Sequence, residues 1–270
     1  EFFILGINER SVIIGKHQSA HRETDTSFIT ENTIPVIRRI SGGGTVFHDK
    51  GNLNFTFILN SREGKQIDFR KYTLPVISFL STLGIDAKFG DKNDLKVGGL
   101  KISGNAEHVY RDRVLHHGTL LFDSDLGLMR GALRKDTSKY ETRAVRSNPS
   151  PVTNLAGMLN GVDSIYAFRS LMLSWFLENS PGSFPVELSG AETEKIRFLA
   201  DTKYRTWEWN YVPALVPRVA ARLCFRQRLR SLSLARLLSV RRVSPLAEAQ
   251  LPPLAAGGAL PCLCPEFRAG

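Results

Sequence analysis

Residues 38–49, RRISGGGTVFHD, hold the strongest chemical signal in this sequence. Three consecutive glycines let a backbone approach a ligand closely and turn several N–H groups toward one anion. Arg38 and Arg39, just before them, are suited to pairing with a phosphate or a carboxylate. A glycine-rich hairpin turn beside a solvated edge is the alternative, but the arginines and His48-Asp49 favour an anion site. The spacing fits neither a Walker A loop nor the GxGxxG of dinucleotide-binding folds, so a nucleotide would be bound in another way.

A second polar segment spans residues 93–106, NDLKVGGLKISGNA. Gly98-Gly99 predicts a hairpin turn, after which Lys101 starts a strand. The residues that follow Lys101 are too small to cover it, which suits a lysine directed into a pocket; a lysine at an exposed strand edge is the alternative. Asp94 has two equally supported interpretations, as the single carboxylate ligand of a Mg²⁺ ion or as part of a turn with Asn93.

Residues 115–121, LHHGTLL, bring two histidines together. Neighbours in a strand point to opposite faces, so His116 and His117 are poorly placed to bind one ion. Residues 1–211, the body of the chain, have no cysteine and few spaced carboxylates. We therefore expect no transition-metal site and favour a histidine that hydrogen-bonds within the pocket.

Short strands and one clear helix are predicted to position these segments. The helix covers Tyr72–Leu83, with Pro75 in its first turn, and is expected to end at Gly84. The strands are bounded by turn residues, and the last of them alternates apolar and polar residues with period two. They are predicted at residues 2–5, 12–14, 36–40 and 53–59.

Two further helices are predicted in the second half of the body. Asp163 or Ser164 is expected to cap a helix that carries apolar residues from Ile165 to Trp175. Residues 191–202 favour another helix, after a loop at 180–190 that is rich in proline and glycine.

Charge and cysteine content are unevenly distributed. The 270 residues have a net charge of +10, but residues 1–211 contribute +3 and residues 212–270 contribute +7. The near balance of the body and its lack of interleaved aromatic residues argue against a nucleic-acid partner. No stretch approaches the roughly 18–20 apolar residues of a membrane span, so we expect a soluble, cytoplasmic protein. All three cysteines lie beyond residue 211, which excludes disulfides and cysteine nucleophiles from the body.

The sequence changes character at Val212. Residues 212–270 contain no Lys, Asp, Asn, Thr, Ile, Tyr or Trp and are dominated by Leu, Ala, Arg and Pro. A basic helix over Leu223–Val243 is compatible with a basic linker or a membrane-surface segment. A reading-frame or assembly artefact is the alternative that we favour, because the change is abrupt. We expect the tail to be irregular or poorly ordered.

In their order and spacing, these segments resemble the lipoate–protein ligases of the biotin and lipoate ligase superfamily. Ser11–Gln18 and Val152–Leu155 also match that family. Its pattern is RRxSGGGxVxHDxGNxxF, then NDL, then K-[IV]-S-G-[SN]-A, then HHGTLL, and it corresponds in this chain to Arg38–Phe55, Asn93–Leu95, Lys101–Ala106 and His116–Leu121.

The resemblance covers residues 1 to about 211 and implies an α/β (α+β) fold with a mixed sheet. It places a catalytic domain at 1–200 and the start of an accessory domain at 201–211. It also implies a strand and a helix before Phe2 and a complete accessory domain after Tyr211. We therefore expect the chain to be incomplete at its N-terminus and to carry a tail, residues 212–270, that is foreign to the family.

The resemblance implies two-step chemistry with ATP and lipoate as substrates. Lipoate's carboxylate attacks the α-phosphate of ATP, and a lysine of an acceptor lipoyl domain then attacks lipoyl-AMP. The family's essential lysine falls on Lys101, which we expect to neutralise charge in both transition states. Mg²⁺ is expected at Asp94. The nucleotide is expected at Arg39, Gly44, Thr45, Val46, Phe47 and Lys101, and lipoate at Lys101, Gly43, Gly44, His48, Ser103 and His117.

The implied acceptors are the lipoyl domains of 2-oxoacid dehydrogenase complexes or the glycine cleavage H protein. One rival function is a lipoyl or octanoyl transferase. Its cysteine-dependent form is excluded because the body has no cysteine, whereas a transferase that uses preformed lipoyl-AMP stays open. The other rivals are an inactive fragment and a nucleic-acid binder.

Overall fold

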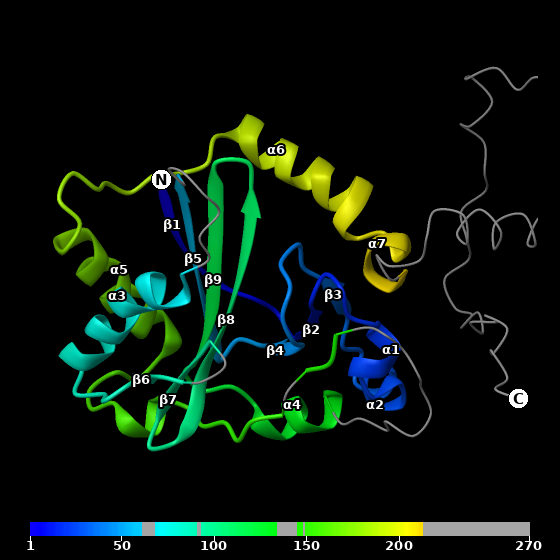
Figure 1. Ribbon diagram of the computed structural model, residues 1–270, viewed down its shortest axis with the longest axis horizontal. Helices are drawn as coiled ribbons and strands as arrows, with labels where there is room; N and C mark the ends of the chain where they lie inside the picture. The colour runs from blue at the N-terminus through cyan, green and yellow to red at the C-terminus, as the bar shows by residue number, and fades with distance from the viewer. Residues whose placement is uncertain (61–67, 91–92, 134–144, 148, 213–270) are drawn as a thin grey trace, which may run out of the picture. The chain divides into compact units, whose positions relative to one another are not determined.

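A computed structural model describes residues 1–60, 68–90, 93–133, 145–147 and 149–212 of the chain (Figure 1). All of them lie in the first of the two units into which the chain divides, Glu1–Val216. The tail from residue 213 on, with the predicted basic helix over Leu223–Val243, lies outside the described residues. Within the described ranges, no helix is long and apolar enough to cross a membrane.

In the described ranges there are two sheets, and the larger has six strands that all pair antiparallel. The predicted strands at residues 2–5 and 53–59 are confirmed within its first two members. A hairpin at Gly98-Gly99, both with positive φ, joins two others, as predicted. The spatial order is β1 (Phe2–Ile7), β5 (Asn52–Asn60), β9 (Arg113–Leu121), β8 (Leu100–Tyr110), β7 (Asp94–Val97) and β6 (Lys88–Phe89).

The smaller sheet has three strands, with β2 (Ser11–Ile14) between β3 (Val36–Arg38) and β4 (Val46–His48). β2 is parallel to β3 and antiparallel to β4, so the expected mixed pairing is present but confined to this sheet. The predicted strand at residues 36–40 ends earlier than expected, at Arg38. The chain leaves the sheet there because the next seven residues form the glycine-rich loop.

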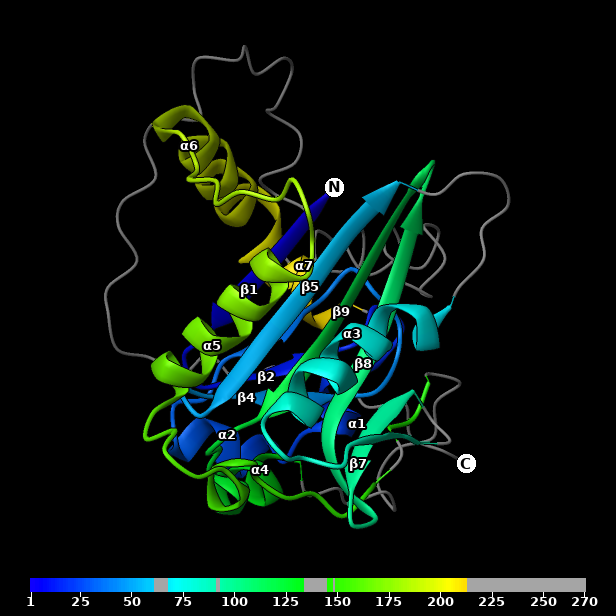
Figure 2. The same cartoon turned by 90° about the vertical axis from the view of Figure 1, so that its left-hand side faces the viewer.

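Two helices cover one face of the large sheet. α3 (Phe69–Thr82) and α5 (Ile165–Glu178) lie across it side by side (Figure 2). Their inner residues, such as Phe79 and Phe168 with ring centroids 5.6 Å apart, pack against the buried apolar side chains of the strands. This core leaves the opposite face of the sheet available for the site.

The ends of these helices test the predicted capping. α5 begins after Ser164, whose side chain accepts from the N–H of Ala167, so Ser164 rather than Asp163 is the cap. α3 ends at Thr82, one residue before the expected Leu83, and the predicted stop Gly84, with φ +78°, directly follows the C-cap residue Leu83. The expected start of α3 at Tyr72 is wrong. Asp68 caps the helix by accepting from the N–H of Lys71, so Pro75 lies in the second turn instead of the first.

A second apolar core joins the small sheet to short helices. It contains Val12 and Ile14 of β2, Phe47 of β4 and Leu121 at the end of β9. The helices that contribute to it are α1 (Ala20–Glu23), α2 (Thr26–Glu31) and α4 (Leu126–Ala132). Because Leu121 belongs to a strand of the large sheet, this core fixes the small sheet beside the uncovered face of the large one.

The last described segment runs from α6 to α7. α6 (Gly190–Leu199) begins with a capping box between Ser189 and Glu192 and continues into a single π-helical turn, Ala200–Tyr204. The predicted helix at residues 191–202 is confirmed in this form. α7 (Trp207–Tyr211) then contacts β3 and α1.

Candidate functional site

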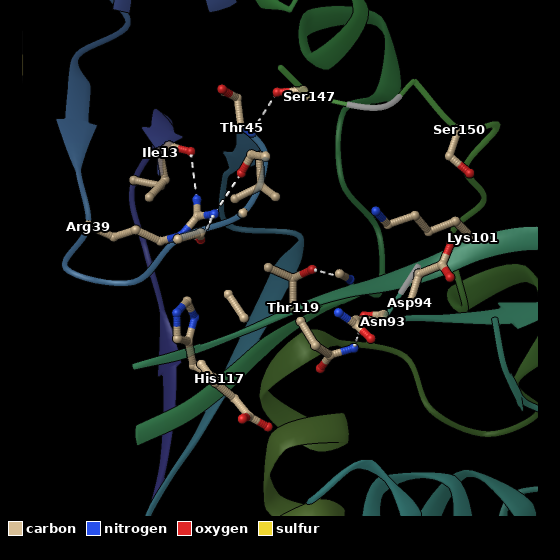
Figure 3. Close-up of a pocket in the computed structure, with 18 of the residues that line it drawn as sticks. Ile13, Arg39, Thr45, Asn93, Asp94, Lys101, His117, Thr119, Ser147 and Ser150 are labelled. Carbon is tan, nitrogen blue, oxygen red and sulfur yellow. Dashed lines mark hydrogen bonds between the residues drawn. The ribbon is translucent and has the colours of Figure 1, made fainter. Parts of the chain in front are cut away.

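A cavity of about 730 Å³ lies between the small sheet with its glycine loop, residues 39–45, and strands β7, β8 and β9 of the large sheet. In the view of Figure 3, Arg39 and His117 stand on one side of it, and Lys101 and Asp94 stand on the other. A second cavity of about 270 Å³ adjoins it, with several lining residues in common. The apolar residues of the second cavity include Phe47, Leu121, Met129, Leu133 and Val152.

Arg39 shapes the glycine loop from within. Its Nη2 donates to the carbonyl oxygens of Gly42 and Gly44, both at 2.7 Å, and its Nη1 donates to that of Ile13 at 3.2 Å. Burial lowers the pKa of Arg39 to about 10, which leaves it charged at neutral pH. The loop therefore surrounds a fixed positive charge that lines the larger cavity.

Arg38 has a different role from the predicted one. Its buried guanidinium donates to backbone carbonyl oxygens and does not line either cavity. The acceptors lie on the loop after β2 and on α7: Gly15, Lys16, Gln18, Trp209 and Asn210. Pairing of Arg38 with a ligand anion is therefore a wrong prediction, because the strand directs this side chain behind the loop.

Lys101 lines both cavities. Its backbone is held on both sides, since its N–H donates to Pro151 and its carbonyl accepts from Thr153. A Cβ on Gly104 would lie 3.2 Å from the Lys101 Nζ, so the lack of a side chain there leaves room for the ammonium group. Burial lowers the pKa of Lys101, the nearby Lys96 lowers it further, and Asp94 opposes both effects. The expectation that small following residues leave this lysine in a pocket is confirmed.

The two adjacent histidines face opposite sides of the sheet, as predicted. The His117 Nε2 is 2.6 Å from the Ser41 hydroxyl at the larger cavity, and burial lowers the His117 pKa to about 3. His116 faces the core, where its Nδ1 is 2.9 Å from Glu107. Of these two histidines, only His117 can therefore contact a ligand in the cavity.

His48 also lines the larger cavity. Asn8 lies 2.9 Å from its Nδ1, and burial lowers the His48 pKa to about 4. Together with His117, it gives this end of the cavity neutral imidazoles beside the charged Arg39. Such a site provides hydrogen-bonding groups whose charge does not change between pH 6 and 8.

A polar network that could not be predicted from the sequence holds Thr45, the last residue of the glycine loop. Gln18 accepts from the Thr45 hydroxyl at 2.9 Å and donates to the Ser147 hydroxyl at 2.9 Å. The Ser147 hydroxyl also accepts from the Thr45 N–H at 2.8 Å and donates to Glu23. Gln18 lies in a family-like run, but Glu23 and Ser147 stand in segments that carry no motif, so no local signal marks them.

The carboxylate of Asp94 is the predicted metal ligand. It is buried at the wall of the larger cavity, next to Asn93. Among the described residues, no three His, Cys, Asp or Glu side chains gather as a metal cage. A single carboxylate suits a magnesium ion only where phosphates and water supply the other oxygens.

The sequence model of the lipoyl protein ligase A/B catalytic domain matches residues 1–177, which is more than half of the chain. The chain belongs to this family. It is similar to the lipoate-protein ligase LplJ of Bacillus subtilis, with 38% identity over 213 residues. That match covers 78% of this chain and 64% of the relative, so the chain spans less than two thirds of the relative's length.

Solved structures of lipoyl protein ligases share the fold. A putative lipoate protein ligase from Thermoplasma acidophilum with bound lipoic acid is 29% identical, with a TM-score of 0.65 over 77% of this chain and 85% of that one. A lipoate-protein ligase A bound with ATP is 30% identical, with the same TM-score and coverage. A bi-partite ligase of T. acidophilum, described with its E2 lipoyl domain, is 29% identical, with a TM-score of 0.66 over 77% and 83%.

The ligase-family positions named from the sequence gather around these two cavities. Gly43, His48 and His117 line the larger one alone, and Phe47 and Ser103 line the smaller one alone. Thr45, Val46 and Lys101 line both, and Gly44 and Arg39 line the larger. Lys96 was not singled out from the sequence, although its position opposite Lys101 across the Gly98-Gly99 hairpin could have indicated it.

Proposed function

We propose that this chain is the catalytic part of an ATP-dependent lipoate–protein ligase. The observation that carries the proposal is the position of Lys101, which lines both of two adjoining cavities. One ammonium group can there contact a carboxylate in the larger cavity and a phosphate where the two cavities adjoin. The lipoic acid and the ATP in the two ligase relatives are consistent with such a pair of ligands.

In the proposed first step, a carboxylate oxygen of lipoate attacks the α-phosphorus of ATP. A new P–O bond forms, the bond from the α-phosphorus to the bridging oxygen breaks, and pyrophosphate leaves with the electron pair. Lys101 offsets the negative charge that accumulates where the two anions meet, and Arg39 adds a second positive charge at the glycine loop. Neither residue exchanges a proton in this step.

In the proposed second step, the neutral amine of an acceptor lysine attacks the acyl carbon of lipoyl-AMP. A C–N bond forms, the C–O bond to AMP breaks, and the proton lost by the amine passes to solvent. Lys101 stabilises the departing phosphate. The same ammonium group thus serves both steps, because the α-phosphate does not leave its neighbourhood between them.

The chemistry of the walls supports an assignment of each ligand. Ala106 pairs in register with His117, and these two residues with Ile13 form an end of the larger cavity suited to an acyl chain. Phe47 and Met129 give the smaller cavity apolar walls that suit a nucleotide base. Lipoate is therefore assigned to the larger cavity near His48 and His117, and the base to the smaller one.

Mg²⁺ fits the wall of the larger cavity as a partner of the phosphates. Asp94 would hold it through one carboxylate oxygen, with the remaining ligands supplied by phosphate and water. When bound, the ion would screen phosphate charge. Asp94 also has a role without the ion, because its charge counteracts the effect of burial on Lys101.

The proposed partners are lipoyl domains of 2-oxoacid dehydrogenase complexes or the glycine cleavage H protein, and the proposed location is the cytoplasm. The archaeal relative described with its E2 lipoyl domain supports a lipoyl domain as acceptor. Residues 201–211 are proposed as the start of an accessory domain, and residues 212–270 as a tail outside the ligase pattern.

The test is lipoate-dependent exchange of radiolabelled pyrophosphate into ATP by the full chain. Exchange that disappears in Lys101→Ala is the expected result. A chain that fails to exchange but transfers the lipoyl group from added lipoyl-AMP to a lipoyl domain is a transferase instead of a ligase. A folded chain with neither activity would refute the proposed function.

A further inference from the structure

α7 contacts Arg38, the residue just before the glycine loop, and does not line either cavity. The side-chain oxygen of Asn210 accepts from the N–H of Arg38 at 2.7 Å, and the indole N–H of Trp209 donates to the Arg38 carbonyl at 2.7 Å. Neither Trp209 nor Asn210 lines a cavity. Both ends of one residue in β3 are therefore bound by a segment 171–172 positions away.

The Arg38 side chain connects α7 with the loop after β2. Its Nε and Nη2 donate to the carbonyls of Trp209 and Asn210, both at 2.9 Å. Its Nη1 donates to the carbonyls of Gly15, Lys16 and Gln18 at 3.1, 3.2 and 2.7 Å. One buried guanidinium thus ties α7 to residues 15–18.

Residues 15–18 in turn contact the glycine loop. The N–H of Lys16 donates to the Ser41 carbonyl at 2.9 Å, and Gln18 accepts from the Thr45 hydroxyl at 2.9 Å. Gly15 lies so close to the loop that a Cβ on it would stand 2.2 Å from the Gly43 carbonyl oxygen. An unbroken series of contacts therefore links α7, Arg38, residues 15–18 and the glycine loop.

We propose that Trp209 and Asn210 are positioning residues which, through Arg38 and residues 15–18, hold the glycine loop in its ligand-binding conformation. The inference rests on the proposed function, since it concerns the same loop. Docking of α7 and occupancy of the larger cavity then favour each other, because coupling between two sites is reciprocal.

Two tryptophans of α7 provide a test variant and a matched control. Trp209→Phe removes the donor to the Arg38 carbonyl and keeps an aromatic ring in place. Trp207→Phe makes the same chemical change on the same helix, where the side chain is half exposed and stacks on Tyr211. Asn210→Ala removes more hydrogen bonds and should have the larger effect. If Asn210→Ala does not fold, Trp209→Phe alone still tests the proposal.

The first readout is hydrogen–deuterium exchange of the full chain without ligand. The protected amides that report on the path are those of Lys16, Arg39 and Thr45, which bond to Ser41, Ile14 and Ser147. In Trp209→Phe these amides should exchange about 3- to 10-fold faster, the range expected for one lost hydrogen bond. Amides of α3 and α5 should not change, because their core is separate from this path.

The second readout is pyrophosphate exchange. KM for lipoate should rise about 3- to 10-fold in Trp209→Phe while kcat stays within about twofold, and Trp207→Phe should match the wild type. Unchanged amide exchange in residues 15–18 and 39–45 would overturn the inference, as would equal acceleration across α3 and α5. If the wild type itself catalyses no pyrophosphate exchange, the proposed function fails, and the deuterium readout still decides the positioning role.

Discussion

Gly15→Ala tests how closely the glycine loop must be placed. A Cβ at this position would stand 2.2 Å from the Gly43 carbonyl oxygen, whereas ordinary contact begins at 3.4 Å. The two backbones must therefore separate by roughly 1.2 Å, since the obstacle is a carbonyl and not the end of a flexible side chain. A misplacement of about 1 Å can cost about 10²-fold in rate. We expect kcat/KM for lipoate in pyrophosphate exchange to fall by about that factor.

Stability separates this displacement from general unfolding. Overpacking at Gly15 should cost about 1–3 kcal/mol in the free energy of unfolding, measured by urea denaturation. Gly6→Ala is the matched control, because a Cβ there meets nothing within 4 Å, and it should leave activity unchanged. A folded Gly15→Ala chain with wild-type kcat/KM would refute the requirement for close contact between Gly15 and the glycine loop.

Three further predictions concern the charged and titrating groups of the cavity. Lys101→Met keeps the volume of the side chain and removes its charge. It should lower both pyrophosphate exchange and lipoyl transfer from lipoyl-AMP by about 10²- to 10³-fold, with no loss of thermal stability. Loss of only one of these activities would contradict a role of Lys101 in both steps. Lys96→Met should raise KM for ATP about 3- to 10-fold in steady-state assays and leave KM for lipoate unchanged, because Lys96 lines the cavity near Asp94. Burial lowers the pKa of His48 to about 4 and that of His117 to about 3, below the ordinary 6.5, so the unfolded chain binds more protons than the folded one. The free energy of unfolding should therefore fall as the pH decreases from about 6.5 toward 3. In urea denaturation, His117→Asn should make this pH dependence less steep, and an unchanged slope would exclude His117 as a cause.

The sequence predicts most of the elements that carry the site. Alternation in residues 53–59 identifies β5, and Gly98-Gly99 identifies the hairpin that presents Lys101. The opposite orientations of His116 and His117 follow from the period of a strand alone. These features are local, so a single sequence contains the information that determines them.

The parts that the sequence reading missed depend on contacts between distant residues. Arg38 and Arg39 are neighbours of the same type, yet one holds α7 and the other holds the glycine loop, and the difference depends on Asn210, 172 positions away. Ser147 meets Gln18 across 129 positions. No spacing rule connects such pairs, because the fold alone brings them together.

The placement of α3 shows a different kind of error. Apolar periodicity is clear from Val76 onward, and Pro75 is favoured in a first turn, so both signals indicate a late start. The capping bond of Asp68 adds an earlier turn, and Pro75 is accommodated inside the helix. A local propensity was outweighed there by a cap and by the packing of the sheet.

The alternation of β9 also constrains how this protein could change. His117 and Thr119 line the larger cavity, while His116 and Leu120, which flank this pair in the strand, are buried on the core side. Losing or gaining one residue within the strand would exchange the two sets at every later position. The lining of the larger cavity can thus change through substitutions at every second residue, whereas insertions and deletions in this strand would alter the cavity wall and the core together.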